Sequence, residues 1–122
     1  MGDRANFGFR DRKGDTIFLY GHWAGHRMLQ NLADAVSAAE PRWTDEAYAT
    51  RICISQLVNA EWTSETGWGL HVNEIGDNEH KVPIIDWAHQ TFTLMEADLK
   101  TEVFSTSLEG FVAKYCSQLS MV

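Results

Sequence analysis

Residues 5–21, with the sequence ANFGFRDRKGDTIFLYG, decide the fold class of this chain. In the first part Phe7 and Phe9 alternate with smaller residues, a period of two that is typical of β-strands. The glycine in the DRKGD loop suits the left-handed position of a tight turn, so the stretch predicts a β-hairpin. Phe18 and Tyr20 lie on the strand face opposite the aliphatic residues, and we therefore expect both faces of the sheet to be at least partly covered.

Helical periodicity replaces this alternation at residues 26–39, where apolar residues recur three and four positions apart. Pro41 ends this helix. A second helix is predicted from an N-cap at Thr44 to about Ala60, since the acidic residues that follow Thr44 favour a first helical turn. The short EPRW connection between the two helices implies an antiparallel pair.

Alternation returns in the second half of the chain. It predicts strands over residues 68–75, 80–87, 90–96 and 101–106, followed by a C-terminal helix. We expect Thr106 and Glu109 to form a capping box for that helix, and Pro83 to place its strand at a sheet edge or a bulge. The order ββ-αα-βββ(β)-α predicts a single α+β domain over residues 1–122. In it the hairpin and the later strands form a mainly antiparallel sheet, with two central helices and a C-terminal helix packed on it.

Composition narrows the class of function. The 122 residues are 44% hydrophobic, enough for an ordered core, and the formal net charge of −7 argues against binding to long nucleic acids. Cys53 and Cys116 are too far apart in sequence for a thiolate zinc site. The chain opens with no signal-peptide pattern and has no apolar run of membrane-spanning length, so we expect a cytoplasmic protein without a membrane partner.

The stretch FLYGHWAGHRM, residues 18–28, contains two histidines four positions apart. His22 and His26 could share a metal ion only if both lay on one helix face, but the glycines beside them separate a strand end from a helix start. We therefore assign no metal ligand here. The strand-to-helix corner presents Trp23 and Arg27, and a helix N-terminus offers free N–H groups to an anion.

Arg51 lies within the apolar arc of the second predicted helix when that helix is wound at about 100° per residue. A charge at such a position needs a partner or a cavity, because burying it alone costs several kcal/mol. Two alternatives follow. Arg51 either forms a structural ion pair with Glu65, Asp86 or another carboxylate, or it lines a pocket and binds an anionic group.

The stretch SETGWG, residues 64–69, could form the wall of a ligand pocket, with Trp68 stacked on a flat ring and Thr66 hydrogen-bonded to it. Glu65 and Asp86 are candidate acids or bases, but no partner at a suitable spacing supports catalysis, and we assign no catalytic residue and no cofactor. The candidate ligand-binding residues are His22, Trp23, Arg27, Trp43, Arg51, Glu65, Thr66, Trp68 and Asp86.

Four motifs between Leu19 and Phe92 carry a family resemblance: LYGHWAG, RWTDEAYATRI, ETGWG and IIDWAHQTF. In this order they resemble a group of small uncharacterised proteins of tailed phages and bacteria, with the pattern Y-x-H-W-x-G, R-W-x-D-x-x-Y-x-x-R and E-T-G-[YW]-G. Trp87 and Ala88 depart from the looser sequence of the group. The resemblance implies a phage accessory protein in the host cytoplasm that counters host defence, and it supplies no catalytic residue.

Three hypotheses for function follow. The first is a non-enzymatic protein that binds a small anionic, nucleotide-derived ligand, such as a host immune signal, in a pocket of tryptophans and arginines. The second is a protein–protein inhibitor or adaptor that acts on a host protein through an acidic or aromatic surface. The third is a small hydrolase or lyase that uses His22, His71 or Asp86, with or without a metal. We also expect a homo-oligomer that pairs through a sheet edge formed by HKVPIID.

Overall fold

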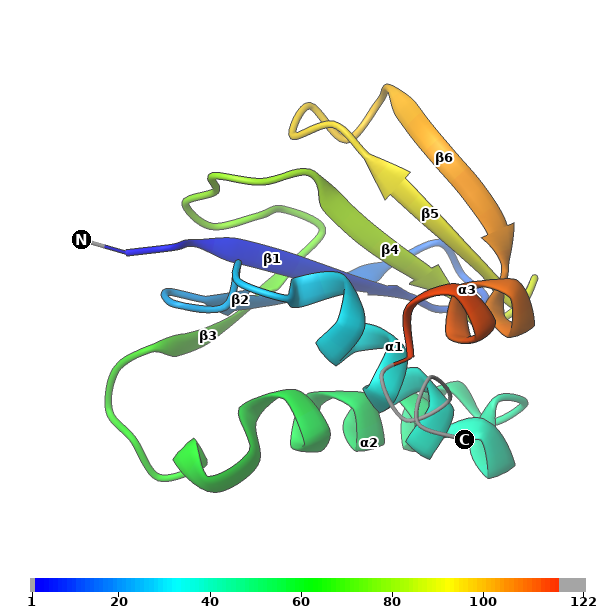
Figure 1. Cartoon of the computed structure of the whole chain (residues 1–122), viewed down its shortest axis with the longest axis horizontal. Coiled ribbons are helices and arrows are strands. Elements are labelled where there is room, and N and C mark those ends of the chain that lie inside the picture. Colours follow the sequence, from blue (N-terminus) through cyan, green and yellow to red (C-terminus); the bar gives the residue numbers. More distant parts are fainter. Residues whose placement is uncertain (1, 117–122) are drawn as a thin grey trace.

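The structure is a computed structural model that describes residues 2–116, within which a single sheet carries helices on one face (Figure 1). The strands are β1 (Ala5–Arg10), β2 (Thr16–Gly21), β3 (Trp68–Val72), β4 (Val82–Asp86), β5 (Thr91–Met95) and β6 (Glu102–Ser107). The helices are α1 (Met28–Ala38), α2 (Glu46–Val58) and α3 (Leu108–Tyr115), with short 3-10 turns η1 (Glu40–Arg42) and η2 (Asn59–Glu61). The predicted α+β class and the order ββ-αα-βββ(β)-α are confirmed.

The predicted hairpin forms from β1 and β2, which pair antiparallel with Phe7 opposite Leu19. In the connecting loop Gly14 adopts a φ of 91°, a conformation that glycine reaches without strain. The carboxylate of Asp11 accepts hydrogen bonds from the backbone N–H groups of Lys13 and Asp15, at 2.9 and 3.0 Å, and so closes the loop.

The strand order in the sheet is β3-β2-β1-β4-β5-β6, and the β1–β4 pair is parallel while the other pairs are antiparallel. The expectation that Pro83 marks an edge or a bulge is wrong, because β4 lies between β1 and β5 in regular register. Pairing with β1 begins at Ile84, so Pro83 precedes that ladder and interrupts none of its bonds. HKVPIID is therefore not a free edge. In the described chain the two edges are β3 and β6.

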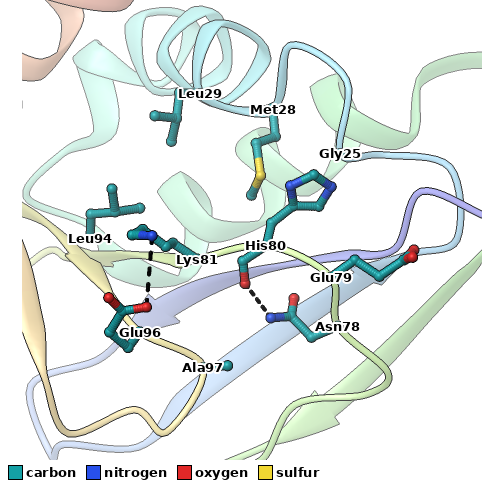
Figure 2. Close-up of a pocket in the computed structure, with 10 residues that line it drawn as sticks. All are labelled: Gly25, Met28, Leu29, Asn78, Glu79, His80, Lys81, Leu94, Glu96 and Ala97. Atoms are coloured by element: carbon teal, nitrogen blue, oxygen red, sulfur yellow. Dashed lines mark hydrogen bonds and ion pairs between the residues drawn. The ribbon is translucent and has the colours of Figure 1, made fainter.

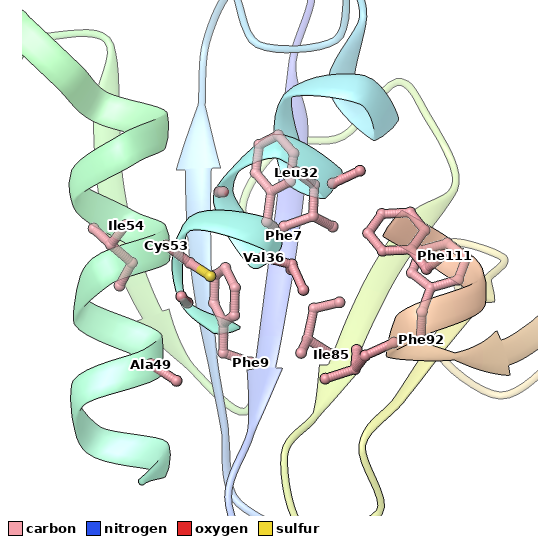
Figure 3. Packing of buried hydrophobic residues seen from close by; sticks show 14 of the residues in the cluster. Phe7, Phe9, Leu32, Val36, Ala49, Cys53, Ile54, Ile85, Phe92 and Phe111 are labelled. Atoms are coloured by element: carbon pink, nitrogen blue, oxygen red, sulfur yellow. The ribbon is translucent and has the colours of Figure 1, made fainter. Parts of the chain in front are cut away.

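The main core lies between the sheet and the three helices (Figure 3). Phe7 and Phe9 of β1 pack against helix residues such as Leu32, and the rings of Phe92 and Phe111 stack with centroids 4.0 Å apart. These rings are at most 2% exposed, which gives the largest hydrophobic stabilisation that side chains of this size can supply.

Helix starts differ from the predictions by one or two residues. The N-cap of α2 is Asp45, whose side chain accepts from the backbone N–H of Tyr48 at 3.4 Å, so the expected cap at Thr44 is wrong. The cap of α3 is Ser107, whose Oγ accepts from Gly110 N at 3.0 Å, and not Thr106. Strand β6 continues through Ser107, which shifts the start of the helix.

The second face of the sheet is covered by the loop of residues 73–81. Asn6 of β1 is fully buried there: its Nδ2 donates to Asp77 O and Asn78 Oδ1 at 3.1 and 3.2 Å, and its Oδ1 accepts from Gly76 N at 3.0 Å. Phe18 packs beside it in a small apolar cluster and is 2% exposed. The prediction that both faces are at least partly covered is thus confirmed.

Candidate functional site

Two of the nine predicted ligand-binding residues, Trp43 and Asp86, form hydrogen bonds that hold the fold together. Trp43 is 9% exposed in the main core, and its indole N–H donates to Val36 O at 2.9 Å. Asp86, at the end of β4, accepts from the backbone N–H and Nδ1 of His89, both at 3.1 Å, and so closes the turn before β5. Both side chains therefore have their polar groups engaged within the fold.

His22 and Trp23 form the corner that follows β2. The Tyr20 hydroxyl lies 2.9 Å from His22 Nδ1, and the rings of His22 and Trp23 meet edge-on with centroids 4.5 Å apart. His26 lies in the turn before α1, on a different segment from His22, as predicted. Within residues 2–116 no group of three potential metal ligands gathers at one place.

The ETGWG turn packs against this corner through its glycine. His22 N donates to Gly67 O at 2.8 Å, and a Cβ atom at Gly67 would contact the Trp23 ring at 3.4 Å. The indole of Trp68 lies over Gly21 and donates to Glu61 Oε1 at 2.8 Å. Gly21 and Gly67 thus let two tryptophan rings lie close to the backbone.

Arg27, Glu65 and Thr66 are exposed, and none of them lines the hollow that contains Arg51. Arg27 precedes α1 in a left-handed conformation with a φ of 59°. Glu65 and Thr66 lie in the turn before β3, where Thr66 O accepts from the Ser64 hydroxyl at 2.8 Å. The expected pocket in which both arginines meet one ligand is therefore not formed by these side chains.

An apolar groove lies between α2 and strands β2 and β3. It consists of two adjoining hollows, about 500 and 290 Å³ in volume, which share Ile54, Trp62 and Leu70. We call it the α2–β3 groove. Further residues that line it are Phe9, Asp11, Asp15, Ile17, Leu19, Glu46, Ala47, Thr50, Arg51, Val58, Glu61, Ser64, Trp68 and Gly69.

The groove exists because α2 stops short of the sheet edge. Ile17 pairs with Val72 and Leu19 with Leu70, so these side chains share the face on which the helices pack. Leu19 is 2% exposed, whereas Leu70 and Val72 are 63% and 65% exposed. The two edge-strand residues extend the core face into solvent beyond the helix that covers it.

Arg51 lines this groove from α2. Its Nη1 donates to Ser55 Oγ at 3.2 Å, one turn along the same helix. The predicted ion pair with Glu65 or Asp86 is wrong, because among residues 2–116 no carboxylate oxygen lies within 4.0 Å of its guanidinium. Of the two alternatives, the position of Arg51 fits that of an arginine that lines a pocket.

The surroundings of the groove are acidic. Asp11, Asp15 and Glu46 line it near Arg51, and Glu46 also pairs with Arg12 at 2.8 Å. Residues 52–80, which include β3, contain five carboxylates and no Lys or Arg. A single lining arginine is therefore outnumbered by carboxylates, and the local potential favours a cationic partner.

Sequence reasoning overlooked Trp62, which is 55% exposed at the end of η2, and the apolar face of β3. The alternation of Trp68, Leu70 and Val72 was visible in the sequence. Whether that face is covered, however, depends on how far α2 reaches across the sheet, and a one-dimensional pattern carries no signal for it.

A second hollow, of about 650 Å³, lies beside Gly25 and α1 and is more polar (Figure 2). Its ionisable side chains pair with neighbours: His80 Nε2 lies 2.5 Å from Asp3 Oδ1, and Lys81 lies 3.8 Å from Glu96. No serine, threonine or cysteine is among its lining residues, so the His80–Asp3 pair has no hydroxyl or thiol side chain beside it in this hollow.

Cys53, which lies in the main core, is unsuited to act as a nucleophile. Its side chain is fully buried, and burial raises the pKa of its thiol well above the ordinary value, so the thiolate is absent near neutral pH.

None of the helices formed by residues 2–116 has the length and apolar character to cross a membrane. Comparisons with protein-family profiles, curated protein sequences and solved structures find no match to this chain.

Proposed function

We propose that this chain is a non-enzymatic binding protein that recognises a segment of another protein in the α2–β3 groove. One observation carries the proposal: Ile17, Trp62 and Leu70, which line the groove, and Val72, which lies on the same face of the sheet, are 39–65% exposed. Exposed apolar side chains that cluster in this way are typical of protein interaction sites, because covering them releases the water that surrounds them.

The charge around the groove favours a protein over a small anion. A nucleotide-derived ligand would need concentrated positive charge, but Arg51 is accompanied by Asp11, Asp15 and Glu46. Arg27 does not line the groove. Of the sequence-based hypotheses, the inhibitor or adaptor with an acidic and aromatic surface therefore has the better physical support. In the phage setting that the resemblance implies, the partner is a host protein.

Site-specific photocrosslinking in a bacterial host tests this proposal. A benzophenone amino acid replaces Trp62 in one variant and Val103 in the control, because Val103 is an exposed apolar residue on the opposite edge strand, β6. We expect a discrete protein adduct only from position 62, and loss of that adduct when Leu70→Lys is added. Equal adducts from both positions, or no adduct from position 62, would contradict the proposal.

A further inference from the structure

Strand β3 has an unpaired edge with backbone groups available for another strand. On the β2 side, His22 N donates to Gly67 O and Asn73 N donates to Thr16 O, both at 2.8 Å. Antiparallel ladders alternate between bonded and non-bonded pairs, so residues 67, 69, 71 and 73 direct their backbone groups to β2. The N–H and C=O groups of Trp68, Leu70 and Val72 therefore point outward from the edge of the described sheet.

This edge lacks the features that usually protect edge strands from pairing. The sequence WGLHV of β3 contains no proline and no lysine, and its register with β2 is regular. The opposite edge differs: the pairing of β6 with β5 has a register shift at Leu94 and Met95. A bulge of this kind twists an edge strand and discourages further pairing, so β3 is the accessible edge of the two.

Of the residues with outward backbone groups, Trp68 and Leu70 line the groove, and Val72 points to the same face of the sheet. Neighbouring strands lie about 4.8 Å apart, so an added strand would place every second side chain beside Trp68, Leu70 and Val72. On the same face these side chains would lie beside Trp62 and the rim of α2. One extended segment can thus satisfy the backbone groups of the edge and cover the exposed apolar surface together.

Charge identifies the chemistry of the segment. Glu61, Glu65 and Glu74 flank β3 in the stretch 52–80, which has no Lys or Arg, whereas Asp77 and Glu79 already pair with Arg4. A second copy of the chain would bring the same acidic stretch and another net charge of −7 to this edge. Like charges across adjacent strands are destabilising, whereas Lys and Arg are attracted, so a basic segment fits and a copy of this chain does not.

We propose that β3 accepts an extended, basic segment of a partner protein as an additional strand, with alternate apolar side chains in the α2–β3 groove. Lys or Arg occupies the positions between them. This inference rests on the proposed function and specifies the partner and its mode of binding. Strand addition combines backbone hydrogen bonds, which supply affinity, with side-chain contacts, which supply specificity.

Selection of short random peptides displayed on yeast tests the chemistry of the segment. We expect selected peptides to alternate apolar residues with Lys or Arg, to bind more weakly at high salt, and to lose binding to Leu70→Lys but not to Val103→Lys. Leu70 is 63% exposed, so Leu70→Lys should keep the fold, and its thermal melting curve checks this. Native mass spectrometry of the peptide-free protein is expected to show a monomer.

Backbone N-methylation of a selected peptide tests the mode of binding. Methyl groups on the alternate amides that face β3 should weaken binding about tenfold or more, as loss of one or two hydrogen bonds implies. Methyl groups on the other amides should have little effect. Equal effects of both sets, or selected peptides without alternation or basic residues, overturn this inference; if Leu70→Lys still abolishes binding, the groove keeps its proposed function.

Two further outcomes would contradict the proposed partner or the proposed function itself. A dimer that Leu70→Lys dissociates would make a second copy the occupant of β3 and overturn the inference. No enrichment of any peptide above the Leu70→Lys background would contradict both the strand addition and protein binding by the groove.

Discussion

Replacement of Asn6 tests how the second face of the sheet is held together. Asn6 is fully buried and takes part in three hydrogen bonds of 3.0–3.2 Å with the loop of residues 73–81, to Gly76, Asp77 and Asn78, besides a longer one of 3.5 Å to Gly76 O. Each neutral hydrogen bond contributes about 1 kcal/mol net, so Asn6→Ala should lower the free energy of unfolding by about 3 kcal/mol if the loop stays in place. Because the loop is partly exposed, water can replace some of the bonds and reduce the loss to about 2 kcal/mol.

Urea denaturation followed by tryptophan fluorescence measures this loss as a lower midpoint at constant slope. The near-isosteric Asn6→Asp should cost more than Asn6→Ala. Its second oxygen would face the acceptors Asp77 O and Asn78 Oδ1, and a carboxylate would be buried without a cation. Asn78→Ala, which removes one of the bonds to Asn6 together with the bond from Asn78 Nδ2 to His80 O, is the control and should cost less. A loss below about 0.5 kcal/mol for Asn6→Ala, or a neutral Asn6→Asp, would refute the reasoning.

Three further predictions concern other parts of the molecule. Trp43→Phe should cost about 1 kcal/mol in urea denaturation, because Val36 O loses the indole donor and keeps only the Ala39 N–H; an unchanged midpoint would contradict this. Gly67→Ala should cost about 1–2 kcal/mol, since alanine is strained at a φ of 98°, while its methyl group would make only an ordinary contact with Trp23; equal stability would contradict that backbone conformation. Backbone and side-chain hydrogen bonds from Arg4 lower the pKa of the Glu79 carboxyl, so this contact contributes stability above the ordinary carboxyl pKa and loses it as the pH falls through the lowered value. An NMR titration should show a partial rise of the Glu79 pKa in Arg4→Ala, because the variant loses the guanidinium but keeps the backbone N–H bond; an unchanged pKa would contradict the side-chain contact.

The candidate site was predictable only in part. The glycines around His22 predicted that His22 and His26 lie on different segments, which the structure confirms, but not that Trp23 and Trp68 lie against glycine backbones. Trp43 is a tryptophan like Trp23 and Trp68, but its side chain is buried in the core. Local patterns report residue type and spacing, whereas exposure depends on what packs above a residue. The groove at Trp62 and Leu70 therefore had no signal of its own in the sequence.

The sequence by itself determined the kinds of element and their order. Period-two alternation around Phe7 and helical periodicity around Leu32 depend on residues a few positions apart, so they can be recognised without the fold. The tertiary structure alone decided the strand order. Insertion of β4 beside β1 leaves β3 at the edge, and the reach of α2 leaves Leu70 uncovered. These features arise from contacts between segments distant in sequence, whose relative stability depends on the packing of the whole core.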